Sequence, residues 1–275
     1  MESHSALSAS PAVSGIPGTA HDDLVSVIIP SYNMARYLPK SVASALAQTY
    51  ANFEVVIVDD GSSDNTSEVV RQWADDPRVR VHRQANGGLS HARNQGIAHS
   101  SGPYIALLDA DDIWMPHKLS LQMALFKDRP QVGVVFSNYE RMNDNEEFMP
   151  MGPTAMYRGK VSGRLLIENF VPASSAVVRR TCFERCGGFE VALKTGEDYE
   201  MWLRLSAHTE FDFVPEALMR YRIWGGSMSR DYRGRFETAI RVMQRFLDQN
   251  PGLVDKQVVN EAWAHTYTSR GNATL

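Results

Sequence analysis

Three carboxylates stand together in the run Asp109, Ala110, Asp111 and Asp112, directly after an apolar stretch of strand length. Like charges this close repel one another, so the run is stable where water or a cation neutralises it. Carboxylate oxygens are hard ligands that suit Mg²⁺ or Mn²⁺, and such an ion can offset the charge of a diphosphate leaving group. The alternative is an acidic turn that caps a helix starting near Pro116.

A second acidic pair, Asp59 and Asp60, also follows an apolar run and precedes Gly61 and Ser62. Successive side chains at a strand end point to opposite faces, so one of the two carboxylates faces a given crevice. There it could accept a hydrogen bond from a nucleobase N–H or a ribose hydroxyl. A turn followed by an N-cap would explain the same residues.

A glycine turn, Gly87 and Gly88, precedes Arg93 by one helical turn. The glycines allow close backbone approach, and Arg93 could contact a phosphate or hold a residue of the acidic loop. Two further arginines, Arg222 and Arg230, flank a glycine-containing loop that could close over a diphosphate. In the alternative interpretation, both loops and their arginines are simply solvated.

Glu197 and Asp198 begin a strongly helical segment, and Asp198 shares a face of that helix with Met201 and Trp202. A carboxylate on an apolar face is unusual unless it has a partner or a task. A partly buried carboxylate with a raised pKa suits a general base. The alternative is a capping box, in which Asp198 accepts a hydrogen bond from the N–H of Thr195.

The elements that must position these residues alternate between strand and helix. We expect strands at residues 25–29, 53–58, 79–81 and 104–108, separated by helices at 38–46, 62–73 and 89–99. Such alternation predicts a mostly parallel sheet with helices on both faces. Ligands bind at the carboxyl ends of such strands, where both acidic clusters fall. Further strands are expected at 132–136, 174–178 and 211–223, and helices at 197–207, 233–249 and 253–269.

Composition excludes several classes of protein. The 275 residues are 43% hydrophobic and 22% charged, which excludes general disorder, and the net charge of −4 argues against nucleic acid as a partner. The two cysteines form no disulfide framework or zinc site and fit a reducing compartment. No apolar run is long enough to span a membrane. Motifs of dinucleotide dehydrogenases, P-loop NTPases and serine hydrolases are missing.

Together and in this order, the motifs resemble those of the family 2 glycosyltransferases, which have the GT-A fold. The matching stretches are residues 25–33, 58–64, 86–94, 108–112 and 196–202. The resemblance covers about residues 24–230 and implies a Rossmann-like α/β fold with a mostly parallel sheet flanked by helices. The C-terminal helices lie beyond the shared core.

The resemblance also implies roles for individual residues. The implied nucleotide-binding positions are Pro30, Tyr32, Asp59, Asp60, Arg93, Asp109 and Ala110, with Asp60 facing the base. The implied ligands of Mn²⁺ or Mg²⁺ are Asp109, Asp111 and Asp112. Asp198 corresponds to the catalytic base and Glu197 to its neighbour in the family's Glu-Asp pair. The family often has a histidine where this chain has Trp224, which leaves Arg222 and Arg230 as candidates for contacts with the diphosphate.

We therefore expect an inverting transferase that moves a sugar from a nucleoside-diphosphate donor, with a UDP-sugar as the expected donor, to an acceptor hydroxyl in polysaccharide or glycoconjugate biosynthesis. The acceptor would be a glycan or a lipid-linked glycan, met by a cytoplasmic enzyme that contacts the inner face of the membrane. The expected division is a flexible tail (1–22), a nucleotide-sugar half (23–112), an acceptor half (113–232) and a helical extension (233–275).

Two alternatives remain open at this point. A sugar-nucleotide pyrophosphorylase would share the parallel sheet and the metal-binding acids. It should have a glycine-rich loop with an arginine after the first strand, whereas residues 31–35 read Ser-Tyr-Asn-Met-Ala. The second alternative is a non-catalytic homologue that only binds the nucleotide, and the presence of Asp198 argues against it.

Overall fold

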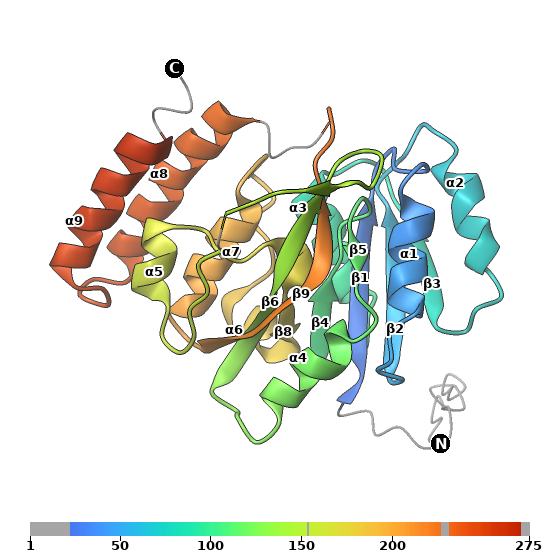
Figure 1. The fold of residues 1–275 in the computed structure, drawn as a ribbon, viewed down its shortest axis with the longest axis horizontal. Helices are drawn as coiled ribbons and strands as arrows, with labels where there is room; N and C mark the ends of the chain where they lie inside the picture. The colour runs from blue at the N-terminus through green and yellow to red at the C-terminus, as the bar shows by residue number, and fades with distance from the viewer. Residues whose placement is uncertain (1–22, 153, 227–230, 271–275) are drawn as a thin grey trace, which may run out of the picture.

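The computed structural model describes residues 23–152, 154–226 and 231–270. The expected tail and Arg230 lie outside these residues. One nine-stranded sheet runs through the molecule in the order β3-β2-β1-β4-β8-β6-β9-β5, with β7 paired to β6 (Figure 1). The strands are β1 (Val25–Ser31), β2 (Phe53–Asp59), β3 (Val79–Arg83), β4 (Tyr104–Leu107), β5 (Ile113–Trp114), β6 (Val132–Met142), β7 (Phe148–Met149), β8 (Val177–Arg179) and β9 (Glu210–Arg222).

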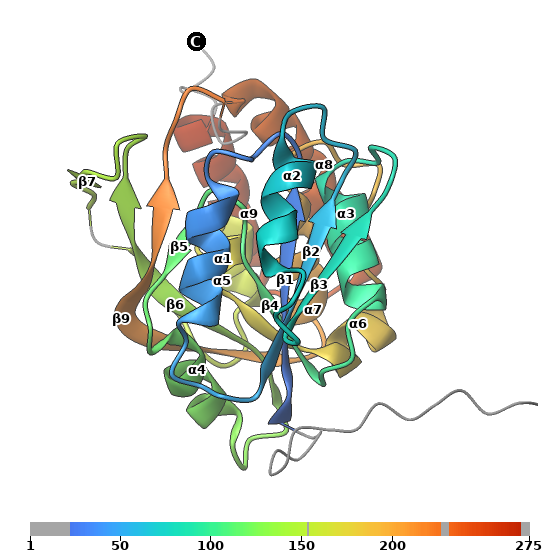
Figure 2. The same cartoon turned by 90° about the vertical axis from the view of Figure 1, so that its right-hand side faces the viewer.

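Helices cover both faces of this sheet (Figures 1 and 2). They are α1 (Leu38–Leu46), α2 (Thr66–Val69), α3 (Leu89–Ala98), α4 (Lys118–Phe126), α5 (Ser162–Ile167), α6 (Arg180–Cys186), α7 (Glu197–Ser206), α8 (Tyr232–Gln249) and α9 (Lys256–His265). Short 3₁₀ turns continue α2 and precede β8, and a π-helical turn follows α9. Among the residues described, no helix is both long and apolar enough to cross a membrane.

The first half of the sheet is parallel, as the alternation of strands and helices predicts. Strand β1 pairs in parallel with β2 and β4, and β2 pairs in parallel with β3. Because successive side chains point to opposite faces, Val27 joins the core beside α1, whereas Ile28 joins the core beside α3. Pro30, expected to end β1, lies within it, and the strand continues to Ser31. The carboxyl ends of β1, β2 and β4 consequently meet at one edge.

The second half is mixed in direction. Strand β8 is antiparallel to β4 and β6, whereas β6 runs parallel to β9. Strand β6 is longer than expected because polar residues 137–141 remain paired with β9, through several shifts in register. This extension carries the chain from the bottom of the sheet to its carboxyl edge, beside the site.

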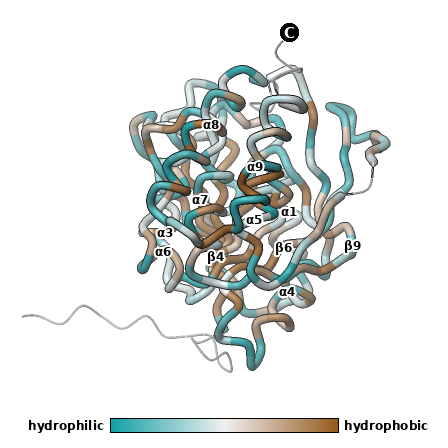
Figure 3. The backbone as a smooth tube through the Cα atoms, turned by 90° about the vertical axis from the view of Figure 1, so that its left-hand side faces the viewer, coloured by the Kyte–Doolittle hydropathy of each residue, from teal (hydrophilic) through white to brown (hydrophobic). Residues whose placement is uncertain are grey.

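The two C-terminal helices pack against the domain rather than standing apart from it. Helix α8 buries Val242, Met243 and Phe246 in the same core as Met201 and Trp202 of α7. Figure 3 shows α8 and α9 beside α5 and α7, all on one side of the sheet. Helix α8 therefore braces the helix that carries the candidate general base.

Gly96→Ala is expected to destabilise the protein, although alanine is the better helix former. A Cβ atom at Gly96 of α3 would clash with Cγ2 of the fully buried Ile28 in β1, so either the helix or the Ile28 side chain would have to shift. Overpacking of this kind costs about 1–3 kcal/mol. Gly152→Ala is the control, because no atom of the described residues lies within 4 Å of its would-be Cβ. Equal urea midpoints for the two variants would contradict this packing.

Candidate active site

The acidic run 109–112 lies at the carboxyl end of β4, beside the ends of β1 and β2. Its backbone is fixed on two sides, because the N–H of Asp109 donates to Ser174 Oγ at 3.0 Å and its carbonyl accepts from Ser41 Oγ at 3.1 Å. Strand β5 separates the run from α4, whose N-cap residue is His117. The alternative in which this run caps the helix near Pro116 is therefore wrong.

Arg93 connects the acidic run 109–112 with the start of α7. Its guanidinium donates from one terminal nitrogen to Oδ1 of Asp109 and from the other to Oε1 of Glu197, each at 2.7 Å. The side chain is only 1% exposed, so the interpretation of Arg93 as a solvated residue is wrong. Its guanidinium carbon also lies 5.2 Å from the centre of the Phe189 ring. Arg93 thus holds the acidic loop and the start of α7 together.

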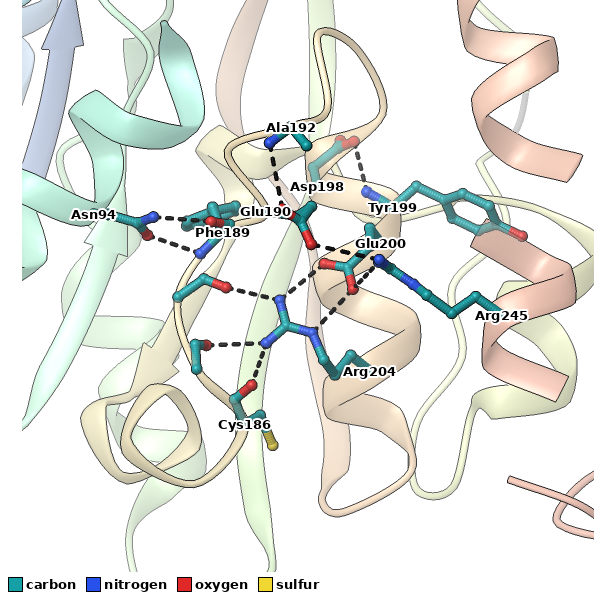
Figure 4. A network of polar contacts seen from close by, with 12 residues as sticks. Asn94, Cys186, Phe189, Glu190, Ala192, Asp198, Tyr199, Glu200, Arg204 and Arg245 are labelled. Atoms are coloured by element: carbon teal, nitrogen blue, oxygen red, sulfur yellow. Dashed lines mark hydrogen bonds and ion pairs between the residues drawn. The ribbon is translucent and has the colours of Figure 1, made fainter. Parts of the chain in front are cut away.

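The loop that carries Phe189 is itself anchored (Figure 4). Asn94 donates to the Phe189 carbonyl at 2.8 Å and accepts from its N–H at 2.7 Å. Arg204 donates to the carbonyls of residues 186–188 and forms a two-pronged ion pair with Glu200. Arg245 of α8 reaches the same carboxylate at 2.7 Å. This network fixes α7 relative to α3 and α8.

Asp198 lies in the first turn of α7, next to Glu197. Its Oδ1 accepts from the N–H of Tyr199 at 2.7 Å and its Oδ2 from the amide of Asn169 at 3.3 Å. The N-cap position belongs to Gly196, so the capping-box interpretation is wrong. Burial, and then the charge of Glu197, raise the pKa of Asp198 to about 6, against the opposing effect of Arg93. A carboxylate of this pKa is ionised at neutral pH and still basic enough to take a proton.

The acids of the run 109–112 differ in how far their side chains are exposed. Asp112 is 1% exposed, accepts the N–H of Arg222 at 2.9 Å, and has a pKa raised well above its usual value by burial and by the charges of Asp111 and Asp109. Asp111 is half-buried, and burial together with the charge of Asp109 raises its pKa to about 6. Asp109 and Asp111 are therefore the two acids of this run that are open to a ligand.

Arg222 is turned away from this opening. Its guanidinium is buried, donates to the Asp111 carbonyl at 2.8 Å and to Glu146 Oε1 at 3.1 Å, and lies 4.9 Å from the centre of the Tyr37 ring. These contacts hold the acidic loop against the β6–β7 turn. The expectation that Arg222 takes over a diphosphate contact has no support in this geometry.

Asp60 also points elsewhere than expected. Its carboxylate accepts from the N–H groups of Gly87 and Gly88 at 2.9 and 2.8 Å and from Gln84 Nε2 at 2.6 Å. With three donors and 2% exposure, it holds the glycine turn rather than facing an open pocket for a base. Asp59 is equally buried and caps the N–H of Ser62 at 3.0 Å.

The remaining expected nucleotide contacts differ in exposure. Tyr32 is 48% exposed directly after β1, so its ring is accessible to a ligand. Pro30, within β1, and Ala110, within the acidic run, are both buried.

The carboxylates at this edge of the sheet offer oxygen ligands for a divalent metal. Among the described residues, no group of three or more His, Cys, Asp or Glu is placed to hold an ion. Mg²⁺ and Mn²⁺ are nevertheless often held by one or two carboxylates together with substrate phosphates. Asp109 and Asp111 form such a pair, and the mutual repulsion that raises the pKa of Asp111 is relieved by a cation. These residues fit a metal that a diphosphate helps to bind.

Several residues that build the site were missed by sequence reasoning. Gln84 follows β3 at the carboxyl edge of the sheet, so the rule that located Asp59 and Asp109 could have found it. Asn169 lies in an irregular segment, and Ser174 lies in the 3₁₀ turn before β8, where the sequence predicts the start of a strand, so neither was identified as part of the site.

Comparison with known proteins agrees with this architecture. Residues 26–187 match the profile described as Glycosyl transferase family 2. An uncharacterised glycosyltransferase of Rickettsia felis is 30% identical over 209 residues, which cover 75% of this chain but 34% of that protein. The Escherichia coli enzyme WfgD, a UDP-Glc:α-D-GlcNAc-diphosphoundecaprenol β-1,3-glucosyltransferase, is 33% identical over 184 residues, 67% of this chain and 70% of the relative.

Among solved structures, Staphylococcus aureus TarS in complex with UDP-GlcNAc superposes with a TM-score of 0.71 at 20% identity, covering 89% of this chain and 72% of that one. The chain therefore belongs to glycosyltransferase family 2 and has the GT-A fold. This assignment removes the pyrophosphorylase alternative. The chain spans about a third of the length of the Rickettsia felis relative.

Proposed function

We propose that this chain transfers a sugar from a UDP-sugar to a hydroxyl of a glycan or lipid-linked glycan, with inversion at the anomeric carbon. The observation that supports the proposal is the bridge from Asp109 through Arg93 to Glu197, which links the acidic loop to the neighbour of the candidate base Asp198. The complex of TarS with UDP-GlcNAc and the UDP-Glc donor in the name of WfgD support this choice of nucleotide.

In the proposed reaction Asp198 takes the proton of the acceptor hydroxyl. The acceptor oxygen forms its bond to the anomeric carbon from the face opposite the diphosphate, while the bond from that carbon to the diphosphate oxygen breaks. The electron pair leaves with the diphosphate, and a single displacement inverts the configuration. Glu197 keeps the pKa of Asp198 raised and, through Arg93, fixes the position of the base relative to the donor.

Asp109 and Asp111 would hold a divalent metal, Mn²⁺ or Mg²⁺, and transferases of this family and fold are typically dependent on one. When bound, the ion supplies positive charge that offsets the leaving diphosphate. Asp112, buried behind them, holds the loop through Arg222. Tyr32 is the exposed ring available to the nucleotide.

The acceptor side is formed from residues 113–232 and the C-terminal helices. A lipid-linked acceptor, such as that named for WfgD, would be met at the inner face of a membrane. Among the arginines of α8 that could take part in such a contact, Arg245 is paired with Glu200 and Glu190. A membrane contact through α8 would therefore rest on Arg241, which is exposed and donates to Thr238 at 3.3 Å.

Calorimetric titration with UDP, GDP and dTDP, each with and without Mn²⁺, tests this proposal. We expect Mn²⁺-dependent binding of UDP, weakened at least tenfold in Asp111→Ala, because that variant loses one of two metal-binding carboxylates. Asp75→Ala, at an exposed aspartate outside the site, serves as the control and should bind as the wild type does. Preference for another nucleotide would change the donor, and binding of none by folded protein would favour the non-catalytic alternative.

A further inference from the structure

Asp111 is held, through its backbone and its side chain, by residues at and just beyond the end of β9. The Nε–H of Arg222, the last residue of this strand, donates to the Asp111 carbonyl at 2.8 Å, and the backbone N–H of Arg222 donates to Oδ1 of Asp112 at 2.9 Å. The indole N–H of Trp224 donates to Oδ2 of Asp111 at 2.8 Å. One of the two candidate metal ligands therefore depends on this strand end for its position.

The rest of the Arg222 side chain is fixed by the turn between β6 and β7, at residues 143–147. One terminal nitrogen donates to the carbonyls of Asn143 and Asp144 at 3.4 and 3.3 Å, and the other donates to Oε1 of Glu146 at 3.1 Å. Only 2% of Arg222 is exposed. Burial of a guanidinium is costly unless its donors are satisfied, and here Nε and both terminal nitrogens have acceptors.

The turn at residues 143–147 is itself attached to the start of α1. The Tyr37 hydroxyl and the guanidinium of Arg36 donate to the carboxylate of Asp144 at 2.5 and 2.9 Å. The ammonium of Lys40 donates to Oε1 of Glu146 at 2.6 Å. The turn therefore joins the helix that follows β1 to the guanidinium that holds the acidic loop.

The pairing of the strands does not require this guanidinium. Arg222 and Met142 are already partners in the parallel ladder between β6 and β9, and Ile113 of β5 is paired with Arg220. Asp111 lies in a turn outside both ladders. The Arg222 side chain therefore adds a link that the sheet does not supply, from β9 to the backbone of a candidate metal ligand.

We propose that Arg222 is a positioning residue for the divalent metal, which acts by fixing the backbone of Asp111, and that the turn at residues 143–147 is the brace that holds Arg222. This inference rests on the proposed function, because it requires Asp111 to be a metal ligand. The carboxylate projects from the backbone that Arg222 fixes, so a shift of this backbone moves it relative to the carboxylate of Asp109. Loss of an outer partner of a metal ligand typically weakens metal binding by about 10–100-fold.

Charge and position predict opposite results for variants of Arg222. Arg222 is a cation beside the proposed metal, so by charge alone Arg222→Met would strengthen the binding of a second cation. By position the same variant binds the metal more weakly, because the hydrogen bond to the Asp111 carbonyl is lost. Arg222→Lys keeps the charge, but one ammonium cannot reproduce the fork that reaches both Asp111 and Glu146. Position therefore predicts weaker binding in this variant too, whereas charge predicts no change.

Calorimetric titration of Mn²⁺ into the protein at a fixed concentration of UDP separates these two effects. We expect Arg222→Met and Arg222→Lys, shown to be folded by circular dichroism, to bind Mn²⁺ about tenfold more weakly than the wild type. Arg220→Met is the matched control, because Arg220 lies in the same strand and pairs with Glu140, but these side chains are 47% and 38% exposed. It should bind Mn²⁺ as the wild type does. Equal or tighter binding in the Arg222 variants overturns the proposal.

Glu146→Gln tests the brace without changing Arg222, and it decides the question if the Arg222 variants do not fold. Glutamine still accepts a hydrogen bond, but a neutral acceptor binds a guanidinium less strongly than a carboxylate does, so we expect a smaller loss of Mn²⁺ affinity. Glu147→Gln is the control, because this neighbouring carboxylate bonds to Asn143. An unchanged affinity in Glu146→Gln overturns the brace. Metal-dependent UDP binding with unaffected variants leaves the proposed function intact, whereas its absence in the wild type removes both.

Discussion

Asp198→Asn is expected to lower the rate of sugar transfer by about 10²–10⁴-fold, the usual contribution of a general base. Asparagine has nearly the same shape and its side-chain oxygen can still accept from the N–H of Tyr199, but its NH₂ group cannot accept from Asn169 and its amide cannot take the proton of the acceptor. Affinity for UDP should be unchanged, because Asp198 is separated from the acidic loop by Glu197 and Arg93. The measurement is UDP release from the donor selected by titration, with a panel of glycan acceptors.

The control for this variant is Asp248→Asn, at an exposed aspartate of α8 that bonds to Gln244 within the same helix. It changes the same functional group far from the start of α7 and should leave transfer intact. Full activity in Asp198→Asn would mean that the proton goes to another group, and Asp198 would then serve only to hold Asn169.

The pH dependence of the wild type follows from the same residue. Transfer should fall as the pH drops through about 6, because the base is active only when ionised and its pKa is raised to about 6. Glu197→Gln removes a charge that raises this pKa, so the acid limb of the profile should move to lower pH. A profile of kcat against pH for both proteins checks this, and an acid limb that does not move would assign the limb to another group.

Strands β1, β2 and β4 could be predicted because they are buried on both faces. Residues 55–58 of β2, for example, form a continuous apolar run, and such a run followed by Asp59 and Asp60 indicates both the strand and the edge where it ends. Strand β6 shows the limit of this reasoning. Its polar second half is held by pairing with β9, a partner about 80 residues away along the chain that no local pattern indicates.

The acidic clusters lie at the carboxyl edge of the sheet, as the sequence predicts, but the directions of their side chains were not predictable. Asp60 turns into the glycine loop and Arg222 into the β6–β7 turn, because donors and acceptors from distant segments satisfy them there. The contact that unites the site, between Arg93 and Glu197, joins residues 104 positions apart. The sequence presents both charges, and only the tertiary structure shows that they meet.

Arg93→Met is expected to lower the free energy of unfolding by about 3–5 kcal/mol, the usual consequence of removing one partner of a buried ion pair. Methionine fills much of the space but leaves Glu197, whose side chain is 9% exposed, without its cation, and it frees Asp109 to repel Asp111. Arg93→Lys should lose less stability and still lose transfer activity, because a single ammonium cannot match the fork that reaches both carboxylates. Urea denaturation followed by circular dichroism gives the first quantity, and UDP release the second.

Arg233→Met is the matched control for this pair, because Arg233 also bonds to a glutamate but its side chain is 85% exposed and that of Glu237 is 58% exposed. A pair so open to water contributes less than about 1 kcal/mol. The difference between the two variants in the free energy of unfolding measures how much burial adds to the stability that the Arg93 bridge contributes. If Arg93→Met and Arg233→Met were equally stable, Arg93 would not hold the two motifs together. The alignment of the base with the donor would then have to come from the packing of α7 against α8 and from the anchored loop at Phe189.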